Sequence, residues 1–553
     1  MKSIFNTFEF NNLRGDIAGG ITAAIVSLPM ALAFGVASGA GAEAGLYGAI
    51  LVGLFAAIFG GTPTLISEPT GPMTVVMTAV LTTMMASNPE NGLAMAFTVV
   101  MIAGLFQILL GLLKLGKYIT LMPYSVISGF MSGIGIILII LQIAPFLGQA
   151  SPSGGVTGTL AKLPELWANI QPLETLLGLA TLAILFFTPA KVGKYLPPQL
   201  LALVFGIIIS VTLLADADIR RIGEISMGIP SIHLPTFTPE QITTMLLDGM
   251  VLGTLGCIDS LLTSVISDSL TRQEHKSDKE LIGQGVGNFV SGLLGGLPGA
   301  GATMGTVVNI QTGARSAVSG VVRAVALIIF VLGAAELTKS IPLAVLAGIA
   351  LKVGLNILDW SFVKRAHKVS LHASLIMYGV MLLTVFFDLI VAVGLGVFIA
   401  NILTIERLSA LQTKNIKAIS DADDEVPLTP TEKRLLDNAA GRVLLVYFSG
   451  PMIFGVSKAI AREHSTIQRY QSIVLDLSDI PLIDTTISLA IENTIRDAVD
   501  NDRKVFVVKP RDQVETTLAR LGVFELIPGA QLTETREAAL EKAISDLEEN
   551  GVS

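Results

Sequence analysis

Cysteine and charged residues are both scarce in this chain of 553 residues. The single cysteine, Cys257, excludes an intramolecular disulfide and any metal site built from several cysteines, and we interpret it as a packing residue. Only 14% of the residues are charged, 52% are hydrophobic, and the mean hydropathy is +0.70. This composition differs from that of soluble globular proteins and indicates a protein that crosses the membrane several times.

Acidic residues outnumber basic ones in this chain, and the formal net charge is -8. Nucleic-acid binding needs a basic face, so we expect no nucleic-acid partner. The five histidines are scattered without the spacing of a metal site. The glycine-rich stretch 283–287 follows no strand, and we interpret it as packing glycines rather than a nucleotide loop. Without a Walker motif, catalytic triad or metal cluster, the sequence predicts neither an enzyme nor a pump, and no cofactor.

Apolar segments follow one another as far as residue 410, and we predict a polytopic α-helical transport domain over 1–410. Lysine and arginine concentrate in alternate loops, which predicts cytoplasmic termini in a plasma-membrane protein. We place fourteen transmembrane segments at 15–37, 43–60, 70–86, 92–113, 120–138, 171–188, 198–214, 245–268, 281–297, 303–312, 316–334, 341–357, 371–387 and 388–405.

The charge density after residue 420 is typical of soluble proteins. We predict a linker over 411–440 and a cytoplasmic α/β domain over 441–553. Strand-like runs within that domain alternate with helical patterns. These runs are 442–448, 472–477 and 504–508.

Proline and glycine interrupt corresponding segments in the two halves of the transport domain. The run 67–72 precedes the third segment, and the run 297–303 precedes the tenth. Seven crossings followed by seven more predict an inverted repeat, in which paired interruptions mark the substrate site. Half-helices that begin after the breaks would present partially positive amides near the midplane, which predicts an anionic substrate. Close helix packing alone is the alternative explanation.

Asp259 lies in the apolar run 250–263 of the eighth predicted segment. An ionised carboxylate at bilayer depth needs a compensating cation, proton or polar cavity. Thr263 is four residues further on, so the two side chains share one helix face and can both offer oxygen atoms to a hard cation. A protonated carboxyl inside the bundle, as in a proton-coupled carrier, is the alternative.

These motifs resemble the sulfate permease (SulP) family of anion transporters, and within it the bacterial sodium-dependent bicarbonate transporters of the BicA type. The resemblance covers nearly the whole chain. It implies seven-plus-seven inverted repeats with core and scaffold subdomains, an elevator or alternating-access mechanism, and a C-terminal STAS domain, often in a homodimer. The residues that carry it are 66–72, 259–264 with Asp268 and His275, 280–285, 298–309 and the STAS-like run 476–486.

We predict that Asp259 and Thr263, with the carbonyl of Gly301 and the hydroxyl of Thr303, bind Na⁺. We predict that bicarbonate lies beside it, contacted by Thr70 and the amides of Ala302 and Thr303. Many eukaryotic members of the family carry an arginine where this chain has Gly305. Its absence, with a carboxylate nearby, favours sodium symport over an uncoupled anion site.

Three further groups receive interpretations. Glu68 is expected to be a helix cap or to lie in a solvated loop, and a place at the mouth of the site is the alternative. The loop with Asp268 and His275 is expected to be solvated, and a gate is the alternative. Thr485 and Thr486 stand where STAS domains can be phosphorylated, but the usual serine-glycine ending is missing, and Asp484 is expected to cap the helix.

Sodium-coupled uptake of bicarbonate is therefore the leading hypothesis. A sulfate or dicarboxylate carrier is the alternative within the transporter class. An anion channel, or a membrane sensor that signals through its tail, is the alternative from another class.

Overall fold

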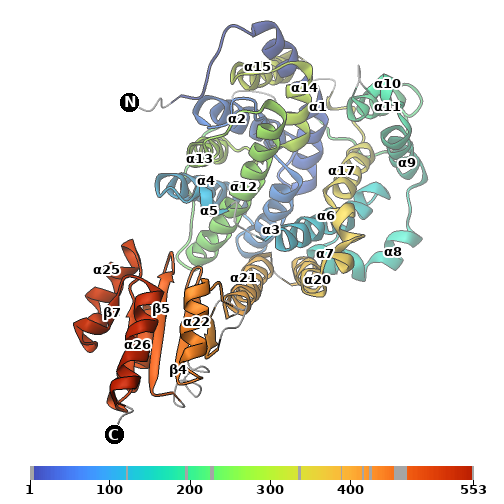
Figure 1. Cartoon of the computed structure of the whole chain (residues 1–553). Coiled ribbons are helices and arrows are strands. Elements are labelled where there is room, and N and C mark those ends of the chain that lie inside the picture. The colour runs from blue at the N-terminus through green and yellow to red at the C-terminus, as the bar shows by residue number, and fades with distance from the viewer. Residues whose placement is uncertain are drawn as a thin grey trace. The chain divides into compact units, whose positions relative to one another are not determined.

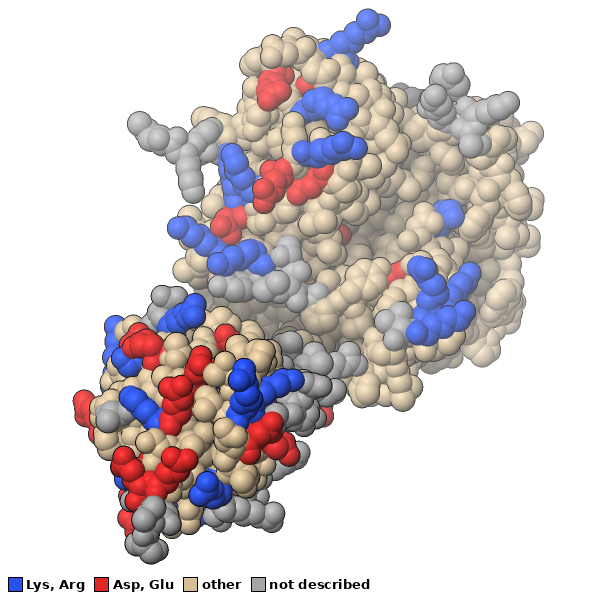
Figure 2. Space-filling model, viewed as in Figure 1, with Lys and Arg blue, Asp and Glu red and all other residues tan. Residues whose placement is uncertain are grey.

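The computed structural model describes residues 5–119, 123–193, 197–223, 230–333, 338–387, 389–413, 416–421, 426–453 and 470–550. The chain divides into two compact units, Met1–Val397 and Phe398–Ser553 (Figure 1). Charged side chains crowd the visible face of the second unit, whereas most of the visible face of the first is uncharged (Figure 2). This contrast matches the change in composition after residue 420.

Within the described residues, each of the fourteen predicted segments overlaps one long helix, and residues 120–122, 334 and 388 of these segments lie outside the described residues. Five helices in the described residues, α1, α2, α4, α6 and α12, are long and apolar enough to cross a membrane. The other long helices are shorter or more polar, so the count of fourteen spans stays a prediction. The long helices are α1 (Leu13–Ser38), α2 (Ala42–Phe59), α3 (Gly71–Ser87), α4 (Gly92–Leu112), α6 (Tyr124–Phe146), α9 (Pro172–Phe187), α11 (Pro198–Thr212), α12 (Ile242–Thr271), α13 (Ser277–Leu293), α14 (Thr303–Thr312), α15 (Val318–Gly333), α17 (Leu343–Ile357), α20 (Leu371–Phe386) and α21 (Leu389–Thr413).

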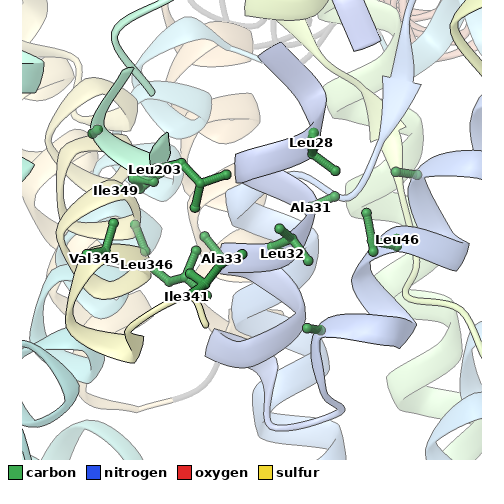
Figure 3. Close-up of a cluster of buried hydrophobic side chains, with 14 of the residues drawn as sticks. Leu28, Ala31, Leu32, Ala33, Leu46, Leu203, Ile341, Val345, Leu346 and Ile349 are labelled. Carbon is green, nitrogen blue, oxygen red and sulfur yellow. The ribbon is translucent and has the colours of Figure 1, made fainter. Parts of the chain in front are cut away.

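The long helices of the first unit pack in two groups. In one group α13 packs on α2 and α4, α12 packs on α4, and α1 packs on α2, α14 and α15. In the other, α6 packs on α17 and α20, and α9 packs on α11 and α17. Where α1 meets α11 and α17, the contact is a cluster of buried aliphatic side chains, including Leu32, Leu203 and Val345 (Figure 3).

Two short strands join the predicted breaks in the helices. β1 (Ser67–Glu68) and β2 (Ala300–Gly301) pair antiparallel, with Ser67 opposite Gly301 and Glu68 opposite Ala300. Helix α3 begins three residues after β1, and α14 begins two residues after β2. Because an antiparallel pair has local two-fold symmetry, it brings the two helix N-termini together, as an inverted repeat requires.

A polar face on α13 holds the backbone around both strands. Glu280, Gln284 and Asn288 follow at intervals of one helical turn and therefore lie on one side of the helix. Glu280 accepts hydrogen bonds from the amides of Gly61 and Thr62, both at 2.8 Å. The Gln284 amide donates to Ser67 Oγ, and the Asn288 amide both donates to the carbonyl of Gly299 and accepts from its N–H. Backbone groups freed by the breaks thus find partners inside the protein.

The glycines beside this polar face allow the close packing that the sequence predicted. A Cβ at Gly283 would lie 2.4 Å from the backbone nitrogen of Gly60, and one at Gly285 would lie 2.6 Å from the carbonyl oxygen of Gly104. The interpretation of 283–287 as packing glycines is confirmed. Cys257 is completely buried, which confirms its packing role too.

The expectation that Glu68 is a cap or a solvated residue is wrong. Its side chain is 2% exposed and forms an ion pair with Arg323 of α15, which is completely buried. The same guanidinium donates to Ser27 Oγ and to the carbonyl oxygens of Ala49 and Ser67. Arg323 therefore neutralises Glu68 and also holds strand β1 against α1 and α2.

The second unit is an α/β domain built on a five-stranded sheet, with the order β3 (Ile416–Ile419), β4 (Val443–Ser449), β5 (Ser472–Asp479), β6 (Lys504–Val508) and β7 (Leu532–Thr533). β3 is antiparallel to β4 and the other pairs are parallel. Apolar side chains of α24 (Thr485–Asp500) belong to one core cluster, and those of α22 (Pro430–Asn438) and α26 (Arg536–Asn550) belong to another. β3 and α22 lie within 411–440, so part of the predicted linker packs in this domain.

We predict that Arg323→Met destabilises the protein strongly, because Glu68 is then left buried without its cation. Loss of one partner of a buried ion pair costs about 3–5 kcal/mol. Thermal unfolding of the detergent-solubilised protein should shift down by several degrees. The double variant Arg323→Met/Glu68→Gln, which removes both charges, should recover a large part of that loss. An unchanged unfolding temperature in Arg323→Met would contradict this role.

Candidate functional site

A cavity of about 510 Å³ lies at the N-termini of α3 and α14. Residues of both breaks form one wall, α12 contributes Asp259, and α1, α6 and α17 contribute mostly apolar side chains. Its lining residues are Met30, Glu68, Pro69, Thr70, Gly71, Pro72, Met131, Asp259, Gly301, Ala302, Thr303, Met304, Val307, Val308, Val353, Asn356 and Ile357.

Asp259 is the carboxylate of this cavity that has no cation of its own. Its side chain is 8% exposed, and its Oδ2 accepts a hydrogen bond from Thr70 Oγ1 at 2.8 Å. No basic side chain among the described residues forms an ion pair with it. The other carboxylate of the cavity, Glu68, is neutralised by Arg323. The cavity therefore contains a buried carboxyl group that no basic side chain of the described residues neutralises.

Oxygen atoms from α12 and α14 gather next to Asp259. The hydroxyl of Thr263 donates to the carbonyl of Gly301 at 2.8 Å and lies 3.0 Å from the hydroxyl of Thr303. Ser260 Oγ accepts from the amide of Gly301 at 3.0 Å. These bonds hold strand β2 against α12, one helical turn from the carboxylate.

The helix N-termini that face the cavity are not capped by side chains. Thr70 and Ala302 precede the first residues of α3 and α14, and neither makes a side-chain capping hydrogen bond. Ala302 has no polar side chain, and the Thr70 hydroxyl is directed to Asp259 instead. The first amides of a helix have no acceptor within that helix, so these two N-termini present partial positive charge to the cavity.

The structure brings the predicted site residues together. Asp259, Gly301 and Thr303 line the cavity with Thr70 and Ala302. Thr263 is completely buried and is not among the lining residues of the cavity, and its hydroxyl instead donates to the carbonyl of Gly301. Their roles in binding Na⁺ and the anion stay predictions.

Arg323 and Ser260 were not predicted from the sequence. Arg323 could have been found, since it is an arginine in an apolar segment and needs an acidic partner at bilayer depth. The acid in the third-segment break, Glu68, was the available candidate. Ser260 gives no comparable signal, because a serine in a helix commonly bonds its own backbone.

The loop with Asp268 and His275 is less solvated than predicted. The His275 side chain is 8% exposed, and its Nδ1 lies 2.6 Å from Asp268 Oδ2. Ser277 Oγ lies 2.9 Å from Nε2 of the same ring. The expectation of a solvated loop is therefore wrong for His275, which fastens the end of α12 to the start of α13.

In the second unit, Thr485 and Thr486 are exposed at the start of α24. Asp484 Oδ1 accepts from the amide of Ile487 at 2.8 Å, which confirms the predicted helix cap. Phosphorylation of either threonine stays a prediction.

Comparison with known proteins places this site in a family. The profile of the sulfate permease family matches residues 13–380, and that of the STAS domain matches residues 437–539. The chain belongs to the sulfate permease family. In this chain the helical membrane unit is followed by a STAS domain.

Relatives of this chain include bicarbonate transporters of cyanobacteria. It is 63% identical to the bicarbonate transporter BicA of Synechocystis sp., over 98% of this chain and 96% of that protein. The solved transmembrane domain of a cyanobacterial BicA is 66% identical, with a TM-score of 0.67 over 70% of this chain and 100% of that one. The murine anion transporter Slc26a9, solved in the inward-facing state, shares the fold at 18% identity, with a TM-score of 0.83 over 98% of this chain and 92% of that one.

We predict that Gly301→Ala weakens cation binding. A Cβ at Gly301 would lie 3.0 Å from the Cα of Ser260 and 3.2 Å from Leu65, so β2 must move away from α12. A displaced Gly301 carbonyl should raise the Na⁺ concentration for half-maximal uptake about tenfold, equivalent to about 1.4 kcal/mol.

Gly379→Ala in α20 is the matched control for this substitution, because nothing lies within 4 Å of the added Cβ. The control should leave the sodium dependence of uptake unchanged. The same half-maximal Na⁺ concentration in both variants would show that the close contact at Gly301 does not affect cation binding.

Proposed function

We propose that this protein carries bicarbonate into the cell together with Na⁺. The observation that carries the proposal is the pairing of one uncompensated carboxylate, Asp259, with two uncapped helix N-termini in the same cavity. A carboxylate attracts a cation, whereas helix N-termini attract an anion. The names of the cyanobacterial relatives support bicarbonate as that anion.

In this proposal Na⁺ binds next to Asp259. Thr70 donates to Oδ2, while Oδ1 accepts no hydrogen bond from the described residues and is available to a cation. The hydroxyls of Thr263 and Thr303 and the carbonyl of Gly301 add the neutral oxygen ligands that hard cations prefer. Sodium would then neutralise the carboxylate without a proton.

Bicarbonate would bind between the helix N-termini, at Thr70, Ala302 and Thr303. The amide of Ala302 already donates to the carbonyl of Ile66 at 2.7 Å, so the N–H groups offered to the anion would begin at Thr303. The two ions would lie side by side, so each lowers the electrostatic cost of binding the other. Such coupling is reciprocal at equilibrium. Without Na⁺, the negative charge of Asp259 would repel the anion from the helix amides. The cavity therefore favours transport of the two ions together.

We further propose that the helices carrying the breaks move against the group containing α6, α9, α11 and α17, as in an elevator. The aliphatic contact of α1 with α11 and α17 supports this, because dispersion contacts have no fixed direction and can be exchanged as helices slide (Figure 3). Cytoplasmic termini, a plasma-membrane location and a homodimer complete the proposal.

Uptake into proteoliposomes separates the candidate substrates. Radiolabelled bicarbonate and radiolabelled sulfate should be offered to the purified protein with and without an inward sodium gradient. We expect bicarbonate to accumulate only with the gradient and sulfate not to accumulate. Sulfate uptake without bicarbonate uptake would refute the substrate, and sodium-independent flux of either ion would refute the coupling.

Asp259→Asn should reduce sodium-dependent uptake at least tenfold, because an amide carries no negative charge to offset that of Na⁺. A tenfold loss corresponds to about 1.4 kcal/mol of cation binding. Asp268→Asn is the matched control on the same helix, because Asp268 pairs with His275 outside the cavity. The control should retain the sodium dependence of uptake. Wild-type uptake by Asp259→Asn would exclude Asp259 as the sodium ligand.

A further inference from the structure

A second cavity, of about 580 Å³, adjoins the first. The two share Met304, Val308 and Asn356, and α1, α9, α11, α14 and α17 contribute to the walls of the second. Its lining residues are Thr22, Val26, Leu185, Gly193, Pro197, Pro198, Gln199, Met304, Val308, Gln311, Thr312, Lys352 and Asn356.

Lys352 is the charged residue in this lining. No carboxylate among the described residues forms an ion pair with it. Its Nζ lies 3.9 Å from the centre of the Phe186 ring, a cation–π contact that holds the ammonium group without neutralising it. A lysine within an apolar helix normally faces a cavity and has a counter-charge. Here the cavity is present, and the carboxylates of the described residues supply no counter-charge.

The position of Lys352 on α17 links it to the proposed transport site. Asn356 is one helical turn further on and therefore lies on the same face of the helix. Asn356 also lines both cavities. An anion that leaves the helix N-termini can thus pass along one face of α17, from a cavity lined by two carboxylates into one lined by a cation.

We propose that Lys352 forms a second anion-binding site for a small oxyanion, the transported anion itself, on its way to or from the transport site. The hydroxyl and amide groups of Thr22, Gln199 and Gln311 supply neutral partners around the charge. Gly193 and Thr312 lie next to loops that the sequence predicts to be cytoplasmic, so this site belongs to the inner mouth of the pathway. The identity of the anion depends on the proposed function, whereas the positive charge of the second cavity does not.

The charge of the cavity can be read with a cysteine reporter. Cys257 is the only cysteine and is buried, so Cys257→Ala with Gln311→Cys gives one reactive thiol in the second cavity. Its rates of reaction with anionic methanethiosulfonate ethylsulfonate and with the cationic ethyltrimethylammonium reagent are measured in the full chain. Adding Lys352→Met should lower the anionic-to-cationic rate ratio at least fivefold, whereas Lys352→Arg should preserve it. Lys162→Met, at an exposed lysine outside the cavity, is the matched control and should not change the ratio.

Occupancy by an anion is tested in the same reporter protein. Bicarbonate, added as its choline salt, should slow the reaction of the introduced cysteine with the anionic reagent when Lys352 is present. In the Lys352→Met variant bicarbonate should have no such effect. Bicarbonate should also slow the reaction in Asp259→Asn, which separates this site from the sodium-dependent one. An unchanged rate ratio in Lys352→Met, or protection that survives that substitution, would overturn the proposal. If Asp259→Asn loses uptake while bicarbonate still protects the cysteine from the anionic reagent, both proposals are supported. If wild-type uptake does not need sodium but Lys352→Met still lowers the rate ratio, only the proposed sodium coupling is refuted.

Transport kinetics add a readout that a packing role would not produce. Lys352→Met should raise the bicarbonate concentration for half-maximal transport about tenfold and leave the half-maximal Na⁺ concentration unchanged, and Lys352→Arg should behave as wild type. A fall in maximal rate with both half-maximal concentrations unchanged would show that Lys352 is structural.

Discussion

Backbone hydrogen bonding around the two helix breaks is the constraint on which this membrane unit depends. In a bilayer, an unpaired amide or carbonyl costs several kcal/mol, so a helix can be interrupted only where other groups replace its own hydrogen bonds. Here the two breaks pair with each other as β1 and β2. Helix α13 supplies Glu280 and Asn288 to the flanking backbone and Gln284 to the hydroxyl of Ser67. The half-helices can then end in the protein interior with their N-terminal amides directed to a cavity.

The arrangement of buried charge follows from the same demand. Glu68 needs a cation because it is buried at β1, and Arg323 provides it while also binding the carbonyl of Ser67. Asp259 of α12 accepts a hydrogen bond from the hydroxyl of Thr70 and has no ion pair among the described residues. The two carboxyl groups of one cavity therefore differ in their surroundings, since Glu68 is paired with an arginine and Asp259 has no basic partner among the described residues. Lys352 has a comparable position in the second cavity, where it has no acidic partner among the described residues.

Several elements were predictable because they depend on local patterns. The apolar segments, the proline and glycine interruptions, and the strand and helix runs of the STAS domain all follow from composition and periodicity along the chain. The cap at Asp484 needs only the residues beside it, and it is present. Glu68 and His275 were misjudged because their environments depend on partners far along the chain or on loop packing, and the sequence around each resembles an ordinary polar loop.

The sequence by itself determined that this is a polytopic membrane protein with two interrupted helices and a soluble α/β domain, because hydropathy and helix-breaking residues act over short stretches of chain. It also marked Asp259, because a charge in an apolar helix is costly wherever the helix packs. Tertiary structure alone decided which charges are neutralised. Arg323 and Glu68 are 255 residues apart in the sequence, and only the packing of α15 beside β1 joins them. The same packing pairs the arginine with Glu68 and leaves Asp259 with no basic partner among the described residues.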